Sequence, residues 1–368
     1  MEPRRTKLNR RAVKAYELPD PELNRKVQEL VEAAGGSSDA DLIAELITTA
    51  IKLQRDGAER GELKLMNTAL KEMRYSNLVF TKYRDVPKVT VFGSARAQES
   101  DPNYRLTVAF GRGMAERGWM VVTGAGPGIM QAANEGAGKE NSFGVNIRLP
   151  FEADANPFVD ESRLINFKYF FTRKLGFVKE SHAFALFPGG FGTMDEAFEL
   201  LTLVQTGKSD LHPIVMLEAP AGSYWQTWFG FVERDLLGNG LITESDLSLF
   251  KITSDVEEAA EEICHFYANY HSQRYVDGRL VLRMARAPSP AVVSELNAEF
   301  ADIVTGGEIE SIGATPAEVR DEDALDQARV ALAFNRRDIG RLRQLVDRLN
   351  DLVKVEPHEL HPPPRFTP

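Results

Sequence analysis

PGGFGTMDE, at residues 188–196, follows an apolar run at residues 182–187 and precedes an amphipathic run at residues 197–204. This succession predicts a buried β-strand, a glycine turn and the start of a helix. Such a turn leaves several backbone N–H groups unpaired at the positive end of the helix, where a phosphate can bind. Glu196 lies at the same end, which indicates an acid/base or cation-stabilising group beside the bound anion.

The same residues also have a purely structural interpretation. Thr193 and Glu196 show the T-x-x-E spacing of a capping box, in which both side chains satisfy N–H groups of the helix start. A proline and three glycines at residues 188–192 favour a ligand-binding turn instead. The sequence alone leaves both interpretations open.

Length and composition predict a large globular protein. The chain has 368 residues, 43% of them hydrophobic, which is enough for a sizeable core and two or three structural units. No apolar run approaches the ~18 residues needed to cross a bilayer, and the N-terminus lacks the apolar segment of a secretory signal. We therefore expect a cytoplasmic protein without a membrane partner. The single cysteine, Cys264, has no internal disulfide partner and is expected to be a buried apolar residue.

The charge argues against nucleic acid as a partner. At a net charge of −10 the chain lacks the clustered lysines and arginines that displace counterions from nucleic acid. Its basic cluster is interpreted as a mobile, solvated arm, and it comprises Arg4, Arg5, Lys7, Arg10, Arg11 and Lys14. His358 and His361 have i,i+3 spacing in the proline-bearing tail, but no further ligands accompany them, so we expect no metal site.

The order of apolar patterns predicts an α/β fold. Helical periodicity at residues 21–34, 39–55 and 62–83 indicates an N-terminal helical extension. Strands are predicted at residues 89–94, 120–124, 144–148, 182–187 and 213–217, with a long helix at 256–271. This alternation predicts a Rossmann-like parallel sheet with helices on both faces, and ligands bind beyond the carboxyl ends of such strands. The glycine turns lie at those ends.

The last part of the chain has a different pattern. A strand at residues 280–286, a helix at 290–303, strands at 307–312 and 328–334, and a helix at 338–353 give the order β-α-β-β-α. This order predicts a small ferredoxin-like α+β unit with antiparallel pairing. We therefore predict four parts: a helical extension (1–85), a Rossmann-like catalytic domain (86–275), the α+β unit (276–355) and an extended tail (356–368).

Two more turns end predicted strands and offer bare backbone to a ligand. They contribute Gly93 and Ser94 after the first strand, and Gly124, Gly126, Gly128 and Met130 after the second. The dinucleotide fingerprint G-x-G-x-x-G would need glycine at position 129, where this chain has isoleucine, and the G-x-x-x-x-G-K-[ST] loop is absent. NAD binding and NTPase activity are therefore disfavoured. Arg96, next to the first turn, could equally be a solvated arginine.

A basic pair lies in the segment that we predict to be a helix at residues 167–179. Its phenylalanines at 167, 170, 171 and 177 fall on one face, and Lys174 lies in the middle of that stripe. A buried ammonium needs a partner. Arg173 and Lys174 together could meet a phosphate or the Glu196 carboxylate. The alternative is that Lys174 reaches solvent and Arg173 makes a surface ion pair.

FGSAR at residues 92–96, GAGPGIM at 124–130, Arg173-Lys174 and the 188–196 stretch together resemble the Lonely Guy family, over about residues 88–270. The resemblance implies a Rossmann-like core, usually a dimer, that hydrolyses the N-glycosidic bond of a nucleoside 5′-monophosphate. AMP and cytokinin riboside monophosphates are the substrates it suggests, and it implies no cofactor. Members are often labelled lysine decarboxylase, but that chemistry needs a Schiff-base lysine, and the sequence identifies no such site.

The resemblance also assigns roles to residues. Arg173 and Glu196 correspond to the family's functional arginine and glutamate. The phosphate-binding turn corresponds to Gly189, Gly190, Gly192 and Thr193, with Pro188 and Lys174 beside them. Many members have two glutamates at the end of the motif, whereas this chain has Asp195 before Glu196. Two alternatives from another class remain: a nucleotide sensor that does not cleave its ligand, and a carrier of a phosphorylated pterin.

Overall fold

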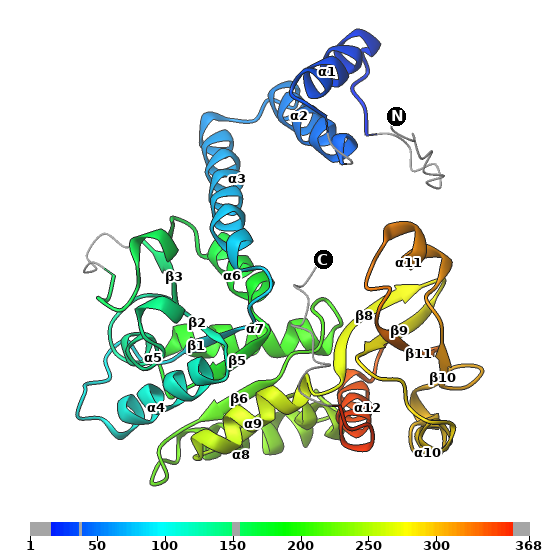
Figure 1. The fold of residues 1–368 in the computed structure, drawn as a ribbon. Helices are drawn as coiled ribbons and strands as arrows, with labels where there is room; N and C mark the ends of the chain where they lie inside the picture. The colour runs from blue at the N-terminus through cyan, green and yellow to red at the C-terminus, as the bar shows by residue number, and fades with distance from the viewer. Residues whose placement is uncertain (1–15, 37–38, 149–154, 356–368) are drawn as a thin grey trace. The chain divides into compact units, whose positions relative to one another are not determined.

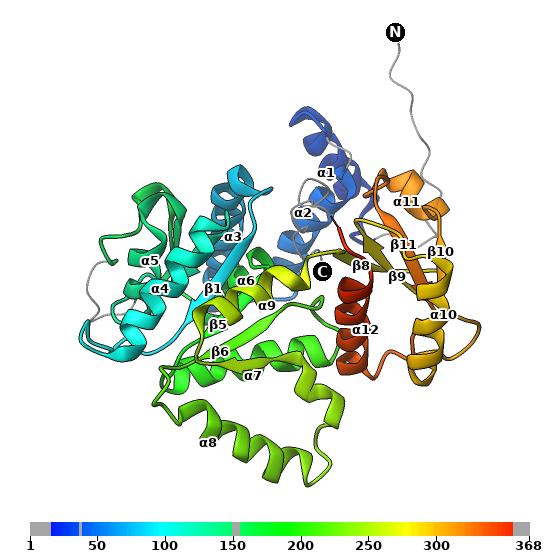
Figure 2. The same ribbon diagram turned by 60° about the horizontal axis from the view of Figure 1, so that its bottom comes forward.

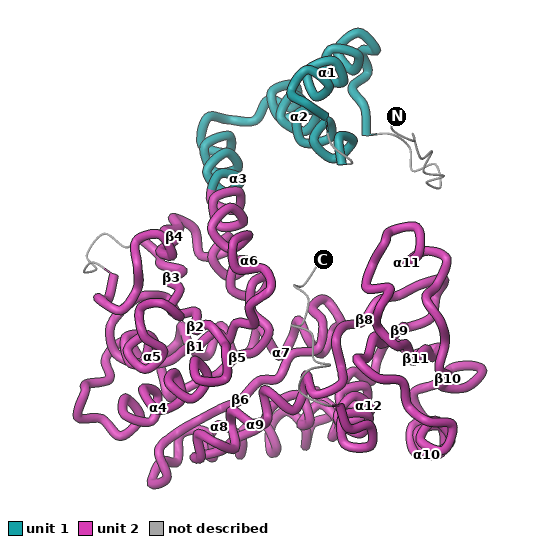
Figure 3. The backbone as a smooth tube through the Cα atoms, in the orientation of Figure 1, with its two compact units in different colours: residues 1–71 teal, residues 72–368 magenta. Residues whose placement is uncertain are grey.

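The computed structural model describes residues 16–36, 39–148 and 155–355. The predicted tail at 356–368 and the basic N-terminal cluster lie outside the described residues. The chain divides into two compact units, residues 1–71 and 72–368, and each is described by itself (Figure 3). The four-part division that we predict from the sequence stays a prediction.

The first unit is helical. It contains α1 (Pro21–Ala33), α2 (Ala40–Arg55) and the start of α3 (Arg60–Phe80), so the three predicted helices are confirmed. Asp20 caps α1 by accepting a hydrogen bond from the N–H of Glu22, 2.9 Å away, and the proline that follows Asp20 suits the first helical position. A small apolar cluster of Val27, Val31 and Ala44 packs α1 against α2.

The second unit is built on a seven-stranded parallel sheet (Figure 1). Its strands are β1 (Lys88–Phe92), β2 (Met120–Thr123), β3 (Ser142–Ile147), β4 (Leu164–Phe167), β5 (Ala183–Leu186), β6 (Ile214–Leu217) and β7 (Lys251–Thr253). They lie in the order β4-β3-β2-β1-β5-β6-β7, and every pairing is parallel. The predicted Rossmann-like α/β sheet is confirmed. β4 and β7 were not predicted.

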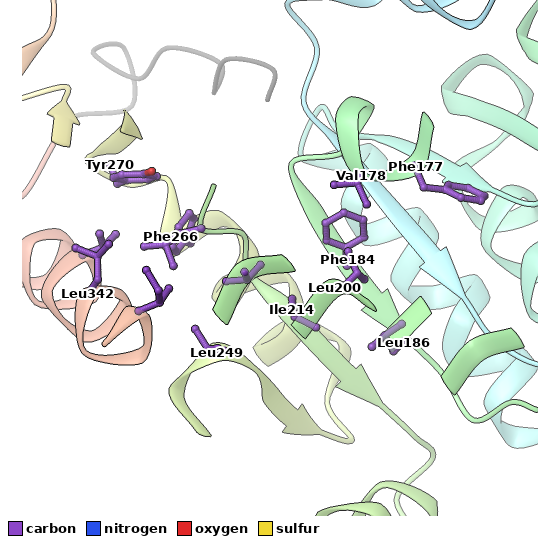
Figure 4. Packing of buried hydrophobic residues seen from close by; sticks show 14 of the residues in the cluster. Phe177, Val178, Phe184, Leu186, Leu200, Ile214, Leu249, Phe266, Tyr270 and Leu342 are labelled. Carbon is purple, nitrogen blue, oxygen red and sulfur yellow. The ribbon is translucent and has the colours of Figure 1, made fainter. Parts of the chain in front are cut away.

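Helices cover both faces of this sheet. On one face α4 (Pro102–Glu116), α5 (Ile129–Ala137) and α9 (Val256–Phe266) share an apolar cluster with alternate residues of β1, β2 and β5. On the other face the end of α3, α6 (Phe170–Glu180), α7 (Phe191–Gln205) and α8 (Tyr224–Phe231) share a second cluster (Figure 4). Because both faces are covered, every residue of β1, β2, β5 and β6 is buried.

A four-stranded antiparallel sheet follows. Its strands β8 (Tyr270–Val276), β9 (Arg279–Met284), β10 (Glu310–Ile312) and β11 (Ala328–Leu332) lie in the order β10-β11-β9-β8, with helices α10 (Pro290–Glu299), α11 (Pro316–Asp321) and α12 (Ile339–Leu352). The predicted order β-α-β-β-α is present from β9 to α12, with α11 added. The predicted long helix at 256–271 is wrong at its end, because α9 stops at Phe266 and β8 begins at Tyr270.

Short helical turns connect these elements. They are Thr81–Tyr83, Lys139–Asn141, Glu161–Arg163, Glu244–Leu249 and Ala301–Ile303, together with a π-helix at Val232–Leu237. The core is continuous from the parallel sheet into the antiparallel one, since Leu249 and Phe266 belong to the same buried cluster as Leu342 of α12 (Figure 4). Helix α12 lies beside α9 and β8 (Figure 2). In the part of the chain that the structure describes, no helix has the length and apolarity to span a membrane.

Candidate active site

Three glycine turns interlock at the carboxyl ends of β1, β2 and β5. The N–H of Ser94 donates to the carbonyl of Pro188, and the N–H of Ile129 donates to the carbonyl of Ser94, both at 3.0 Å. A Cβ on Gly128 would lie 2.3 Å from the Ser94 oxygen, so only glycine allows this approach. The predicted turns are thus brought together into one surface.

Close contacts also explain why position 129 is an isoleucine and why glycines recur in these turns. A Cβ on Gly93 would lie 2.5 Å from Cγ2 of Ile129, and Ile129 is fully buried, so this isoleucine fills the space beneath the first turn. A Cβ on Gly189 would lie 2.1 Å from Oγ1 of Thr193. Gly124 and Gly126 leave room for Met130, because added Cβ atoms there would lie 2.8 Å from its Sδ and 2.6 Å from its Cε.

Helix α7 begins earlier than a capping box at Thr193 requires. Gly190 is its N-cap and provides no side-chain cap, so Thr193 is the third helical residue and Glu196 lies in the second turn. The N–H of Thr193 donates to the carbonyl of Gly190. The capping-box interpretation is therefore wrong. Glu196 is 5% exposed and lies one turn beyond the glycine turn.

The Arg173-Lys174 pair lies on α6, whose start differs from the prediction. The helix begins at Phe170, because Phe167 is the last residue of β4. Phe170 and Phe171 are about half exposed, whereas Phe177 is buried, so the single apolar stripe predicted for this segment is wrong. In the structure, Lys174 of this basic pair contacts Glu196.

Lys174 contacts three carboxylates of α7. Its Nζ lies 2.8 Å from Oδ2 of Asp195 and 3.5 Å from Oε2 of Glu196, and it also pairs with Glu199. Burial opposes the charged form, but the hydrogen bonds to Asp195 and Glu199 and the charge of Glu196 raise the pKa of Lys174 overall. Lys174 is therefore held as an ammonium.

Arg173 connects α6 to the turn after β2. Its guanidinium lies over the rings of Phe170 and Phe177, 5.0 and 5.5 Å from their centroids. A Cβ on Gly124 would lie 3.9 Å from Nη1 of Arg173, so the guanidinium reaches this turn. Arg173 thus lies between the Gly124 turn and the helix that carries Glu196.

Glu196 combines burial with two nearby cations. Burial raises its pKa, the charges of Lys174 and Arg173 lower it, and the charges of Glu199 and Asp195 raise it again, to about 7. Burial therefore outweighs the cations, and Glu196 can either hold or release a proton near neutral pH. A carboxyl group with this property is suited to acid/base chemistry.

The structure adds two residues that we did not single out from the sequence. The hydroxyl of Tyr224, on α8, donates to the carbonyl of Gly189 at 2.5 Å. Glu218, directly after β6, accepts from the N–H groups of Tyr224 and Trp225 at 2.8 and 3.0 Å and so caps α8. An acid at a strand end was the only sequence signal for Glu218. Among the described residues, no cluster of His, Cys, Asp and Glu could hold a metal ion.

Comparisons with known proteins match the central part of the chain. Residues 129–263 match the family model described as "Possible lysine decarboxylase". A search of curated protein sequences gave no significant match.

Among solved structures, the structural-genomics protein TM1055 is 20% identical, with 48% of this chain and 96% of that chain covered and a TM-score of 0.35. The molybdenum cofactor carrier protein from Chlamydomonas reinhardtii is 20% identical (49% and 96% covered, TM-score 0.33). The molybdenum cofactor binding protein from Rippkaea orientalis is 21% identical (49% and 96% covered, TM-score 0.35). Similarity of this degree carries no argument about function.

Proposed function

We propose that this protein hydrolyses the N-glycosidic bond of a nucleoside 5′-monophosphate, because residues 129–263 match the "Possible lysine decarboxylase" family model and the motifs of the site resemble the Lonely Guy family. The products are the free base and ribose 5-phosphate. AMP or a cytokinin riboside 5′-monophosphate is the type of substrate we propose. The resemblance to this family supports a phosphoribohydrolase-type role, and measurement of base release decides among the bases.

The observation that carries the proposal is the environment of Glu196. Departure of the base develops positive charge on the ribose ring, and a carboxylate near the anomeric carbon stabilises that charge. Glu196 is buried one turn beyond the glycine turn at residues 188–192, and its pKa is about 7. It therefore stabilises the oxocarbenium-like transition state when ionised, and it can align or deprotonate the attacking water.

The remaining residues of the site bind the phosphate and orient Glu196. The glycine N–H groups and Thr193 hold the phosphate, so binding energy from this remote group positions the reacting carbon. Arg173 and Lys174 orient Glu196 and favour its ionised form. A Schiff-base lysine must offer a neutral amine, whereas the raised pKa of Lys174 keeps it charged, which supports hydrolysis over decarboxylation at this lysine.

Replacing Glu196 tests the proposal. We expect Glu196→Gln to lower kcat at least ~100-fold, because the amide keeps the shape of the side chain but cannot carry the negative charge. Nucleotide binding should persist. Pure protein is incubated with AMP, GMP, CMP, UMP and a cytokinin nucleotide, and free bases are resolved by chromatography. Glu199→Gln is the matched control: it removes another carboxylate partner of Lys174 and should change kcat less than ~10-fold.

The outcomes separate the classes of function. Equal base release by Glu196→Gln and the wild type would remove Glu196 from the mechanism. Nucleotide binding by the wild type without release of any base would favour a nucleotide sensor. Binding of a phosphorylated pterin in place of nucleotides would favour a carrier.

A further inference from the structure

Helix α6, which carries Arg173 and Lys174, is not capped by its own residues. In the described structure its N-cap residue, Tyr169, makes no side-chain cap hydrogen bond, and the first turn contains no acidic residue. A helix start leaves N–H groups unpaired and carries partial positive charge, so a negatively charged acceptor stabilises it there. For α6 this acceptor comes from another helix.

The acceptor is Glu72, which lies on α3 within the second unit. Its Oε1 accepts from the backbone N–H of Lys168 at 2.7 Å, and its Oε2 accepts from the hydroxyl of Thr172 at 2.6 Å. Thr172 is 1% exposed and directly precedes Arg173. Both carboxylate oxygens of Glu72 therefore hold the start of α6, where their negative charge also interacts favourably with the helix dipole.

Further contacts place α3 beside α6 (Figure 1). Nζ of Lys179, in the last turn of α6, donates to Oδ1 of Asn77 at 2.6 Å. Between the two ends of α6, a Cβ on Gly176 would lie 3.8 Å from Oγ of Ser76, so the helices approach closely there. Phe80, the last residue of α3, is fully buried in the core. The part of α3 that carries Glu72 is therefore fixed against both the core and α6.

The position of α6 decides how two cations meet Glu196. Lys174 lies 3.5 Å from Glu196, and Arg173 precedes it on the same helix. The directions of helical side chains depend on the rotation of the helix about its axis, so a rotation of α6 moves both cations relative to α7. Burial raises the pKa of Glu196, the charges of Lys174 and Arg173 lower it, and the charges of Glu199 and Asp195 raise it. The ionisation of Glu196 therefore depends on where the start of α6 is held.

We propose that Glu72 is a positioning residue for the candidate active site: its carboxylate holds the start of α6 and so sets where the Arg173-Lys174 pair lies against Glu196. This inference rests on the proposed function for the part that Glu196 takes in the reaction. Glu72 lies outside residues 129–263, which match the family model, and on a helix that precedes the parallel sheet. The proposal therefore gives α3 a role in the site.

The titration of Glu196 tests the proposal without substrate. The full chain is labelled with ¹³C at the glutamate carboxyl carbons, and the NMR signal of Glu196 is the one that is missing from Glu196→Gln. We expect Glu72→Ala to raise the pH midpoint of this signal by about 0.5 pH unit or more, because the Arg173-Lys174 pair moves away and stabilises the carboxylate less. Loss of the Glu72 charge alone would lower the midpoint, so the direction of the change identifies its cause.

Two further variants complete the test. Glu72→Gln keeps the shape of the side chain and one acceptor oxygen, so it should raise the midpoint less than Glu72→Ala does. Asn77→Ala removes the hydrogen bond to Lys179 at the other end of α6 and should move the midpoint by less than about 0.2 pH unit. Thermal unfolding is measured in parallel. A merely structural role of Glu72 would lower the unfolding temperature and leave the midpoint of Glu196 unchanged.

Three results would overturn the inference. The first is an unchanged or lowered midpoint in Glu72→Ala. The second applies if Glu72→Ala does not fold, and it is an unchanged midpoint in Glu72→Gln. The third is an equal rise in Asn77→Ala, because any loosening of α6 would then suffice. A wild-type protein that releases no base would contradict the proposed function and would leave the titration result in place.

Discussion

Glu196 should set the lower pH limit of activity. Its pKa of about 7 is raised by burial against the opposing charges of Lys174 and Arg173. Stabilisation of positive charge requires the ionised carboxylate, which is lost as the pH falls through that pKa. We therefore expect kcat/KM to fall with decreasing pH below about 7, by up to tenfold per pH unit. A pH profile of base release from AMP measures this.

The Asp195→Asn variant distinguishes the ionisation of Glu196 from the ionisation of the substrate phosphate. The charge of Asp195 raises the pKa of Glu196, so its removal should move the falling limb to lower pH. The substrate titrates identically in both proteins. Asp235→Asn, at an aspartate that pairs with Arg234 on the π-helix, is the control and should leave the profile in place. A limb that moves to higher pH in Asp195→Asn would contradict the assignment of this pKa to Glu196.

At the residue scale, the sequence predicted which groups meet but not how. The sequence offered a phosphate or Glu196 as partners of the Arg173-Lys174 pair, because the next strand leads into the glycine turn. The 3.5 Å contact of Lys174 with Glu196 agrees with the second of these. The three carboxylate partners of Lys174 depend on how α7 is rotated against α6, which is set by tertiary packing. The predicted capping box is wrong because α7 has Gly190 as its N-cap and begins at Phe191, before Thr193.

At the element scale, α8 fixes the orientation of the glycine turn at residues 188–192. Glu218 caps α8, and Tyr224 on its first turn donates its hydroxyl hydrogen to the carbonyl of Gly189. The described peptide bonds are all trans, so a carbonyl held toward Tyr224 directs the N–H of Gly190 to the opposite side. We therefore infer that Tyr224 positions the N–H groups to which we assign phosphate binding.

Tyr224→Phe removes only the hydroxyl. We expect KM for the nucleotide to rise about fivefold, the equivalent of one hydrogen bond, while kcat changes less than twofold. Steady-state kinetics of base release give both constants. Tyr275→Phe, on β8, is the matched control and should leave both unchanged. A fall in kcat at constant KM would show that Tyr224 does not act through substrate binding.

The central strands of the parallel sheet could be predicted from the sequence, whereas its edge strands could not. β1, β2, β5 and β6 are buried on both faces and consist mainly of apolar residues. The missed strands lie at the edges of the sheet: β4 alternates partly and fully buried residues, and β7 has only three residues. The start of β8 was taken for helix because the apolar spacing of α9 continues past Phe266.

At the scale of the whole second unit, one helix joins the two sheets. Gly340 of α12 packs so closely against residue 245 that an added Cβ would lie 2.0 Å from the carbonyl oxygen of Ser245. Arg343 of the same helix pairs with Glu262 of α9. The sequence predicted the elements of the α+β unit in order, but β8 as its edge strand and this packing are long-range results that no local pattern encodes.

Several large apolar side chains near the candidate site are exposed. They lie on α6 and α7, which the Lys174 ion pairs hold together, and they are Phe170, Phe171, Leu175, Phe191 and Phe198. Phe191 is 97% exposed, and clustered apolar groups of this size mark interaction surfaces. We expect a second copy of the chain to cover them in a homodimer, which light scattering after size exclusion will detect.

Phe171→Asp should shift the wild-type dimer toward monomer and lower base release, because this surface borders Glu196. Leu241→Asp, at another exposed apolar residue, should do neither. A wild-type protein that stays monomeric at micromolar concentration would contradict the assembly.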